Sequence, residues 1–212
     1  MLQKLLADYV RRKYFGLNGN PIAVGVYRPS VLAWSCARRQ FHYYKLFHQR
    51  NPEDIPDDIV LLLGGGVVFH RLVQSFKENG KRYWDRIEIE CSLKATVAGS
   101  NIVLTGHADA IKGDTVYEFK HTRSIPWRKP KFDHQLQANF YMAAIEKVRG
   151  VVVYTGYNEE GGLSIREFPI LFSDWHLEHL ITRAQSLHTW LVHDTPPRCS
   201  CRDRRHEGAV IL

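Results

Sequence analysis

Three consecutive strand-like runs in the middle of the chain constrain the fold more than any other feature. The runs are Ile87 to Val97, Ile102 to Ile111 and Thr115 to His121, and turn residues at 98–101 and 112–114 separate them. Short turns rich in Gly, Asn and Asp join antiparallel neighbours. These runs therefore predict an antiparallel meander.

The segments after the meander alternate between helix and strand. A helix is expected from about Asp133 to Val148, and Val151 to Tyr157 is the continuous apolar run typical of a strand buried on both faces. Gly161-Gly162 predicts a hairpin that returns through Ile165 to Leu171, and Trp175 to Val192 predicts an amphipathic helix. This order predicts an α/β fold with a mixed central sheet flanked by helices.

Two helices are expected before the meander. Ser30 is a favourable N-cap for an aromatic-rich helix that runs to about His48. A second helix is expected from Gly66 to about Glu78, where Asn79-Gly80 ends it.

No repeat or linker divides the chain, so a single domain is expected over residues 1–212. Its N-terminal helical region covers about residues 1–60, and its C-terminal tail covers about residues 195–212.

The longest uncharged apolar run, Ile59 to Phe69, is shorter than the roughly 20 residues that cross a bilayer. Residues 1–13 carry charges among their leucines and no apolar signal core, so a cytoplasmic protein without membrane contact is expected. The net charge of +7 favours a polyanionic partner.

Polar residues interrupt the second and third strand runs where apolar residues would be expected. Asp109 lies inside the second run, and Glu118 and Lys120 lie inside the third. Two carboxylates on adjacent strands repel each other when buried, and a divalent cation removes that cost. Glu118 and Lys120 leave the same strand face, so one can hold a metal while the other assists the attacking water. The alternative is a surface ion pair on an edge strand.

Three further residues can reach the same place. His70 lies on the second helix, one turn after Gly66, whose small size lets the helix approach the sheet. Gln137 and Tyr141 are four residues apart, so they share one face of the helix after the meander.

Four cysteines occur, and two of them form a compact pair near the C-terminal end. Cys199 and Cys201 could present two thiolates to a metal, or they could be incidental. Cys36 and Cys91 lie far away in sequence.

The ordered motifs resemble those of RecB-family nucleases. They are Gly66-x-x-x-His70, Gly106-x-x-Asp109, Glu118-x-Lys120 and Gln137-x-x-x-Tyr141. With Cys36 near the start and a cysteine pair near the end, the chain resembles the CRISPR-associated Cas-four exonucleases over about residues 28 to 206.

This resemblance implies a RecB-like, restriction-endonuclease-like core with specific residue roles. His70, Asp109 and Glu118 would bind Mg²⁺ or Mn²⁺ with the Phe119 carbonyl, and Lys120 would be catalytic. Gln137 and Tyr141 would support the site or contact DNA.

The resemblance also implies an iron–sulfur cluster that joins the N- and C-terminal parts. Cys36, Cys199 and Cys201 would be ligands, although this chain has one residue between the last two instead of two. The fourth ligand is Cys91 or His206, and Cys91 continues an apolar strand face, which favours a core position. A two-iron cluster, a four-iron cluster and a zinc site all stay open.

Aromatic and basic residues interleave in two segments, as in proteins that bind single-stranded DNA. The core is the alternative for about half of the aromatic residues, including Trp34 and Phe41. The segments comprise Tyr27, Arg28, Trp34, Arg38, Arg39, Phe41, His42, Tyr43, Tyr44 and Lys45, and then His121, Arg123, Trp127, Arg128, Lys129 and Lys131.

The sequence thus predicts a metal-dependent exonuclease that acts on single-stranded DNA ends. The resemblance adds processing of spacer precursors in CRISPR adaptation, alongside the CRISPR integrase proteins. A repair or recombination nuclease of the same fold and an inactive DNA-binding adaptor are the alternatives.

Overall fold

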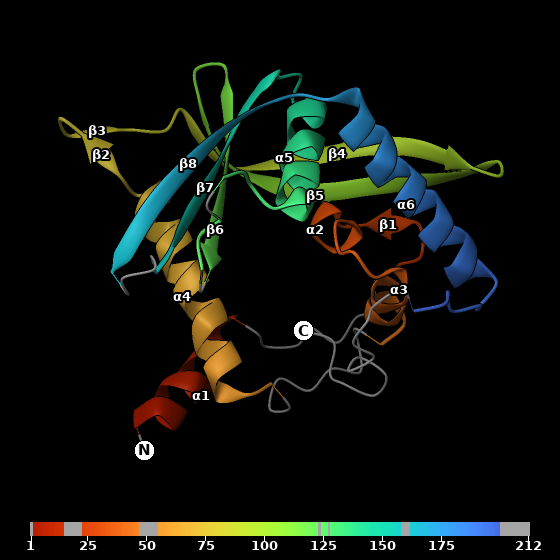
Figure 1. The fold of residues 1–212 in the computed structure, drawn as a ribbon, viewed down its shortest axis with the longest axis horizontal. Helices are drawn as coiled ribbons and strands as arrows, with labels where there is room; N and C mark the ends of the chain where they lie inside the picture. Colours follow the sequence, from red (N-terminus) through yellow and green to blue (C-terminus); the bar gives the residue numbers. More distant parts are fainter. Residues whose placement is uncertain are drawn as a thin grey trace.

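A six-stranded mixed sheet forms the centre of the computed structural model, which describes residues 2–14, 23–46, 55–122, 124–126, 128–157 and 162–199 (Figure 1). The strand order is β1-β5-β6-β7-β8, and β4 also pairs with β5. The β1–β5 and β6–β7 pairs are parallel and the others are antiparallel. The strands are β1 (Val26–Tyr27), β4 (Arg86–Val97), β5 (Ser100–Lys112), β6 (Thr115–Thr122), β7 (Arg149–Tyr157) and β8 (Leu163–Leu171).

The predicted meander is confirmed, because β4, β5 and β6 pair antiparallel in sequence order. The prediction for β7 is also confirmed, since every residue from Val151 to Gly156 is buried between two neighbouring strands. Gly156 is required there: a Cβ atom at this position would overlap the carbonyl oxygen of Thr122 on β6.

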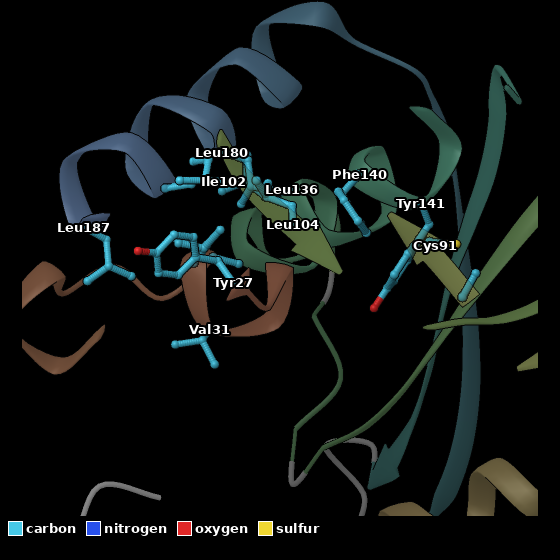
Figure 2. Packing of buried hydrophobic residues seen from close by; sticks show 14 of the residues in the cluster. Tyr27, Val31, Cys91, Ile102, Leu104, Leu136, Phe140, Tyr141, Leu180 and Leu187 are labelled. Carbon is cyan, nitrogen blue, oxygen red and sulfur yellow. The ribbon is translucent and has the colours of Figure 1, made fainter. Parts of the chain in front are cut away.

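Helices cover both faces of the sheet. They are α1 (Leu2–Tyr14), α2 (Pro29–Leu32), α3 (Ala37–Leu46), α4 (Asp57–Gln74), α5 (Phe132–Ala144) and α6 (Asp174–Val192). The largest core cluster joins β4 and β5 to α2, α3, α5 and α6, and Figure 2 shows Leu104, Leu136 and Leu180 packed within it. Phe69 and Val73 of α4 pack with Phe119 of β6 in a separate cluster. The expected mixed sheet flanked by helices is therefore present.

The predicted helix from Ser30 to His48 is wrong, because the chain forms two helices, α2 and α3. The N-cap of α2 is Arg28 instead of Ser30. Between the helices, the Arg183 guanidinium donates to the carbonyl oxygens of residues 32–34 at 3.0–3.2 Å. The Gln40 amide donates to those of residues 32 and 34 at 3.0 and 2.6 Å. These side chains replace the helical hydrogen bonds, so the helix stops.

The predicted helix from Gly66 to Glu78 is wrong at both ends. Helix α4 begins at Asp57, and Lys77–Glu78 forms strand β2 of a small hairpin with β3 (Lys81–Arg82). Positive φ angles of 51° at Asn79 and 78° at Gly80 make the tight turn between them.

One glycine inside α4, Gly64, has a packing reason that the sequence did not reveal. A Cβ atom at Gly64 would lie 2.8 Å from Val10 Cγ1 of α1, so α1 fits against α4 only with glycine there. Arg11 of α1 fixes this contact by donating to the Asp57 carboxylate at 2.6 Å. Within the described ranges, no helix is long and apolar enough to cross a membrane.

Candidate active site

The candidate site lies at an interruption along one edge of β5. On that edge, β1 pairs with Val103 and Leu104, and β6 pairs with residues 110–112. Residues 105–109 therefore have no partner on this edge among the described strands. A cleft of about 640 Å³ opens at the Asp109 end, between α4, β5 and β6.

Asp109 is held by contacts from both α4 and β6. His70 Nδ1 lies 3.3 Å from Asp109 Oδ1, and the Phe119 backbone N–H donates to Asp109 Oδ2 at 2.7 Å. Gln74 Nε2 donates to the Asp109 carbonyl at 3.1 Å. Asp109 thus makes side-chain contacts at the point where β5 and β6 separate. Because the N–H and C=O of one strand residue point the same way, the Phe119 carbonyl also faces this gap.

A hydrogen-bonded chain links Glu118 to helix α5. Lys120 Nζ lies 2.5 Å from Glu118 Oε1 and donates to Gln137 Oε1 at 2.8 Å. Gln137 Nε2 in turn donates to the Tyr141 hydroxyl at 3.0 Å. The predicted helix face of Gln137 and Tyr141 therefore does point toward the strand residues.

Burial and mutual repulsion shape the charges in this site. Burial, and secondarily the Asp109 carboxylate, raise the pKa of Glu118 to about 7. Burial alone would lower the pKa of Lys120, but Glu118 and Asp109 outweigh it and raise the pKa. Burial likewise lowers and the Asp109 hydrogen bond raises the pKa of His70, with a net rise.

The donor set fits a hard divalent cation. An imidazole, two carboxylates and a backbone carbonyl are suitable ligands for Mg²⁺ or Mn²⁺. Glu118 Oε2 is buried and has no hydrogen-bond partner, so one ligand atom is available. Within the described part of the chain, however, no group of three or more His, Cys, Asp or Glu side chains is arranged to hold a metal ion. The Lys120 ammonium contacts Glu118 Oε1 and the Phe119 N–H contacts Asp109 Oδ2, so these two groups must shift for a metal to bind those oxygens.

Three residues of this site were missed at the sequence level. His107 lines the cleft and lies two residues before Asp109, so it shares the same strand face. Gln74 lies one helical turn after His70, a spacing that could have identified it. Glu88 lines the cleft from β4, between Ile87 and Ile89, with a φ of 50°, and no sequence signal marks this conformation.

The structure brings two of the cysteines together. The sulfur atoms of Cys36 and Cys199 are 4.0 Å apart, although the residues are 163 positions apart in sequence. Two thiols at this separation suit a shared metal centre and are too far apart for a disulfide, whose length is about 2 Å. Cys201 and His206 lie outside the described residues.

Cys91 occupies the hydrophobic core, as its strand pattern predicted. It is 2% exposed and lies beside Tyr141 in Figure 2. Its register partner on β5 is Gly106, where a Cβ would approach the Tyr141 hydroxyl to 3.1 Å. The glycine of the Gly106-x-x-Asp109 motif therefore makes room for Tyr141.

Much of the first aromatic segment belongs to the core. The expected burial of Phe41 is confirmed, and Trp34 packs against the core while Arg39 lies 4.3 Å above its ring. The expected DNA contacts are wrong for Tyr27, Tyr43 and Tyr44, which are at most 6% exposed. Their rings pack edge-to-face within the largest core cluster. The exposed basic residues in the two segments include Arg28, Arg128, Lys129 and Lys131, whereas Arg123 and Trp127 lie outside the described residues.

This mixed sheet, with helices on both faces, also occurs in solved structures of other proteins. The crystal structure of SSO0001 shares it, with a TM-score of 0.63 and 16% identity over 97% of this chain and 91% of that chain. An alkaline exonuclease from Laribacter hongkongensis has a TM-score of 0.41 and 14% identity, over 81% of this chain and 90% of that chain. No protein-family model and no curated protein sequence matches.

Proposed function

We propose that this protein is a metal-dependent DNA exonuclease that acts on single-stranded ends. One observation carries the proposal: His70, Asp109 and Lys120 line one cleft, and Glu118, which contacts Lys120, has a buried oxygen without a hydrogen-bond partner. Burying two mutually repelling carboxylates is costly, so a bound divalent cation is the simplest reason for this arrangement.

The residues of the cleft have distinct roles in this proposal. His70, Asp109, Glu118 and the Phe119 carbonyl would hold Mg²⁺ or Mn²⁺. When bound, the metal supplies a water of lowered pKa and neutralises charge on the scissile phosphate. Lys120 orients that water, or stabilises negative charge on the phosphate, through its ammonium group. Gln137 fixes the position of this ammonium by accepting its hydrogen bond at 2.8 Å.

DNA is the substrate that the charges favour. The net charge is +7, and the exposed residues Arg128, Lys129 and Lys131 immediately precede α5, which carries Gln137. Lys131 is placed by its backbone N–H, which donates to the Tyr154 hydroxyl at 2.9 Å. Cations at such positions can contact the phosphates of a nucleic-acid strand that leads to the cleft.

An iron–sulfur cluster on Cys36, Cys199 and Cys201 completes the proposal. The close approach of Cys36 and Cys199 supports it, because a cluster needs thiolates from both ends of the chain. The motif resemblance further suggests processing of spacer precursors in CRISPR adaptation, with CRISPR integrase proteins as partners. A cleft of this kind would serve a repair or recombination nuclease equally well.

A DNA-binding adaptor without nuclease activity is the second candidate. One observation favours it: the Lys120 ammonium lies against Glu118 and thereby neutralises the carboxylate that a metal would need. In an adaptor, this ion pair would be permanent and Mn²⁺ would not bind.

A nuclease assay on end-labelled linear single-stranded DNA tests the proposal. Cleavage should require Mg²⁺ or Mn²⁺, stop in EDTA and spare circular single-stranded DNA. Asp109→Ala and Glu118→Ala should abolish cleavage and leave DNA binding within a few-fold. Glu78→Ala, an exposed change in the β2–β3 hairpin, is the matched control. Wild-type cleavage by either carboxylate variant would exclude the assigned site, and DNA binding without any metal-dependent cleavage would favour the adaptor.

A further inference from the structure

A second cavity adjoins the cleft at the other end of the open stretch of β5. It has a volume of about 350 Å³, and its lining includes Arg28, Ser30, Thr105 and His107. His107 lines both cavities, so they are neighbours along the strand. The second cavity therefore belongs to the same continuous surface as the candidate active site.

The geometry of β5 gives this surface a regular spacing. Side chains alternate along a strand, so Thr105, His107 and Asp109 leave the same face. Successive members of the series are about 6.6 Å apart, since a strand rises about 3.3 Å per residue. Consecutive phosphates of an extended nucleic-acid strand have a comparable separation. A strand whose scissile phosphate lies at Asp109 would thus place the next phosphate near His107 and the one after it near Thr105.

The lining of the second cavity suits an anion. Arg28 contributes a guanidinium, Ser30 and Thr105 contribute hydroxyls, and His107 contributes an imidazole. In contrast to the cleft, its lining has no carboxylate. Arginine and hydroxyl groups are frequent phosphate ligands in proteins that bind nucleic acids.

The local fold fixes the position of Arg28. Strand β1 pairs with Val103 and Leu104 of β5 and then leaves the sheet, so Arg28 lies where the chain turns into α2. Its backbone N–H donates to the buried Tyr44 hydroxyl at 2.6 Å. The tyrosine that the sequence suggested as a DNA contact therefore supports the backbone of the arginine instead.

We infer that the cavity formed by Arg28, Ser30, Thr105 and His107 binds a DNA phosphate next to the scissile phosphodiester. The inference rests on the proposed function, because it assumes that DNA occupies the cleft. The phosphate is either a terminal monoester or an internal diester of the strand. Both have the same oxygen chemistry, and the two sources can be separated experimentally.

Binding of short single-stranded oligonucleotides, measured by fluorescence anisotropy with Ca²⁺ in place of the catalytic metal, tests the inference. Arg28→Gln should weaken binding about tenfold and reduce the salt dependence by about one phosphate contact. Thr105→Val should weaken binding less, because it removes a neutral hydroxyl. Arg82→Gln is the matched control, since this exposed arginine lies in the β2–β3 hairpin, far from β1 and α2 in Figure 1.

Oligonucleotides with a 5′-phosphate and a 5′-hydroxyl distinguish the two sources. If Arg28→Gln loses affinity only for the 5′-phosphorylated strand, the cavity binds a terminal monoester. If it loses affinity equally for both strands, the cavity binds an internal diester. If Arg28→Gln and Thr105→Val bind both strands as tightly as Arg82→Gln does, the subsite is refuted while the proposed nuclease stands. If the wild-type protein binds neither strand, the proposed function fails with it.

Discussion

Proton competition at Glu118 should control metal binding to this protein. The pKa of Glu118 is raised from 4.5 to about 7, by burial first and by Asp109 second. If the carboxylate must be ionised to hold Mn²⁺, lowering the pH from 8.0 to 5.5 should weaken Mn²⁺ binding about 30-fold, a factor that follows from the fraction ionised. Protonation of His70, whose pKa is also raised, adds to the loss.

Thermal unfolding with and without Mn²⁺ measures this effect without any DNA. Mn²⁺ at about 100 times its Kd should stabilise the fold by about 2.7 kcal/mol, or about 5–10 °C in Tm for a chain of this length. Without metal, the dependence of stability on pH has the opposite sign. The raised pKa of Glu118 gives stability that is complete below about pH 4.5 and is lost as the pH rises through about 7. The gap between the two stability curves should therefore widen with increasing pH.

The Glu118→Gln variant is the matched control, because it keeps the size of the side chain and removes its charge. It should lose the Mn²⁺ stabilisation at pH 8.0. An equal Mn²⁺ shift at pH 5.5 and pH 8.0, or an undiminished shift in Glu118→Gln, would show that the metal binds elsewhere.

Three further outcomes are expected. Lys120→Ala should lose most nuclease activity and keep the Mn²⁺-induced Tm shift, because the ammonium is not a metal ligand; loss of the shift would contradict its role. Cys199→Ser should remove the visible absorbance of anaerobically prepared protein, whereas Cys91→Ser should retain it; a colourless, iron-free and zinc-free wild-type protein would exclude the cluster. Gly156→Ala should destabilise the fold by about 1–3 kcal/mol in chemical denaturation because its Cβ overlaps the β6 backbone. Gly66→Ala should be tolerated, since its Cβ would lie 3.6 Å from the nearest side-chain atom; equal stability of both glycine variants would argue against the β6–β7 packing.

Local chemistry explains which parts of the fold could be predicted. The meander was predictable because turn residues at 98–101 and 112–114 act over a few residues. The helix that was expected after Ser30 was not, because Arg183 stops it from 149–151 positions away. The start of α4 was missed for a similar reason, since Gly64, which looks unfavourable in a helix, leaves room for Val10 of α1.

For the site, the sequence by itself determined the residue types and their order on strands and helices. Asp109, Glu118 and Lys120 could be recognised because polar residues inside apolar strands need a reason to be there. Their contacts were decided by the tertiary structure: β5 and β6 separate at Asp109, which frees its carboxylate for His70 and the Phe119 N–H. The open stretch beside Thr105 also depends on where β1 leaves the sheet, which no local pattern encodes. Sequence periodicity fixes the face of a residue, whereas the pairing and divergence of strands depend on packing over the whole domain.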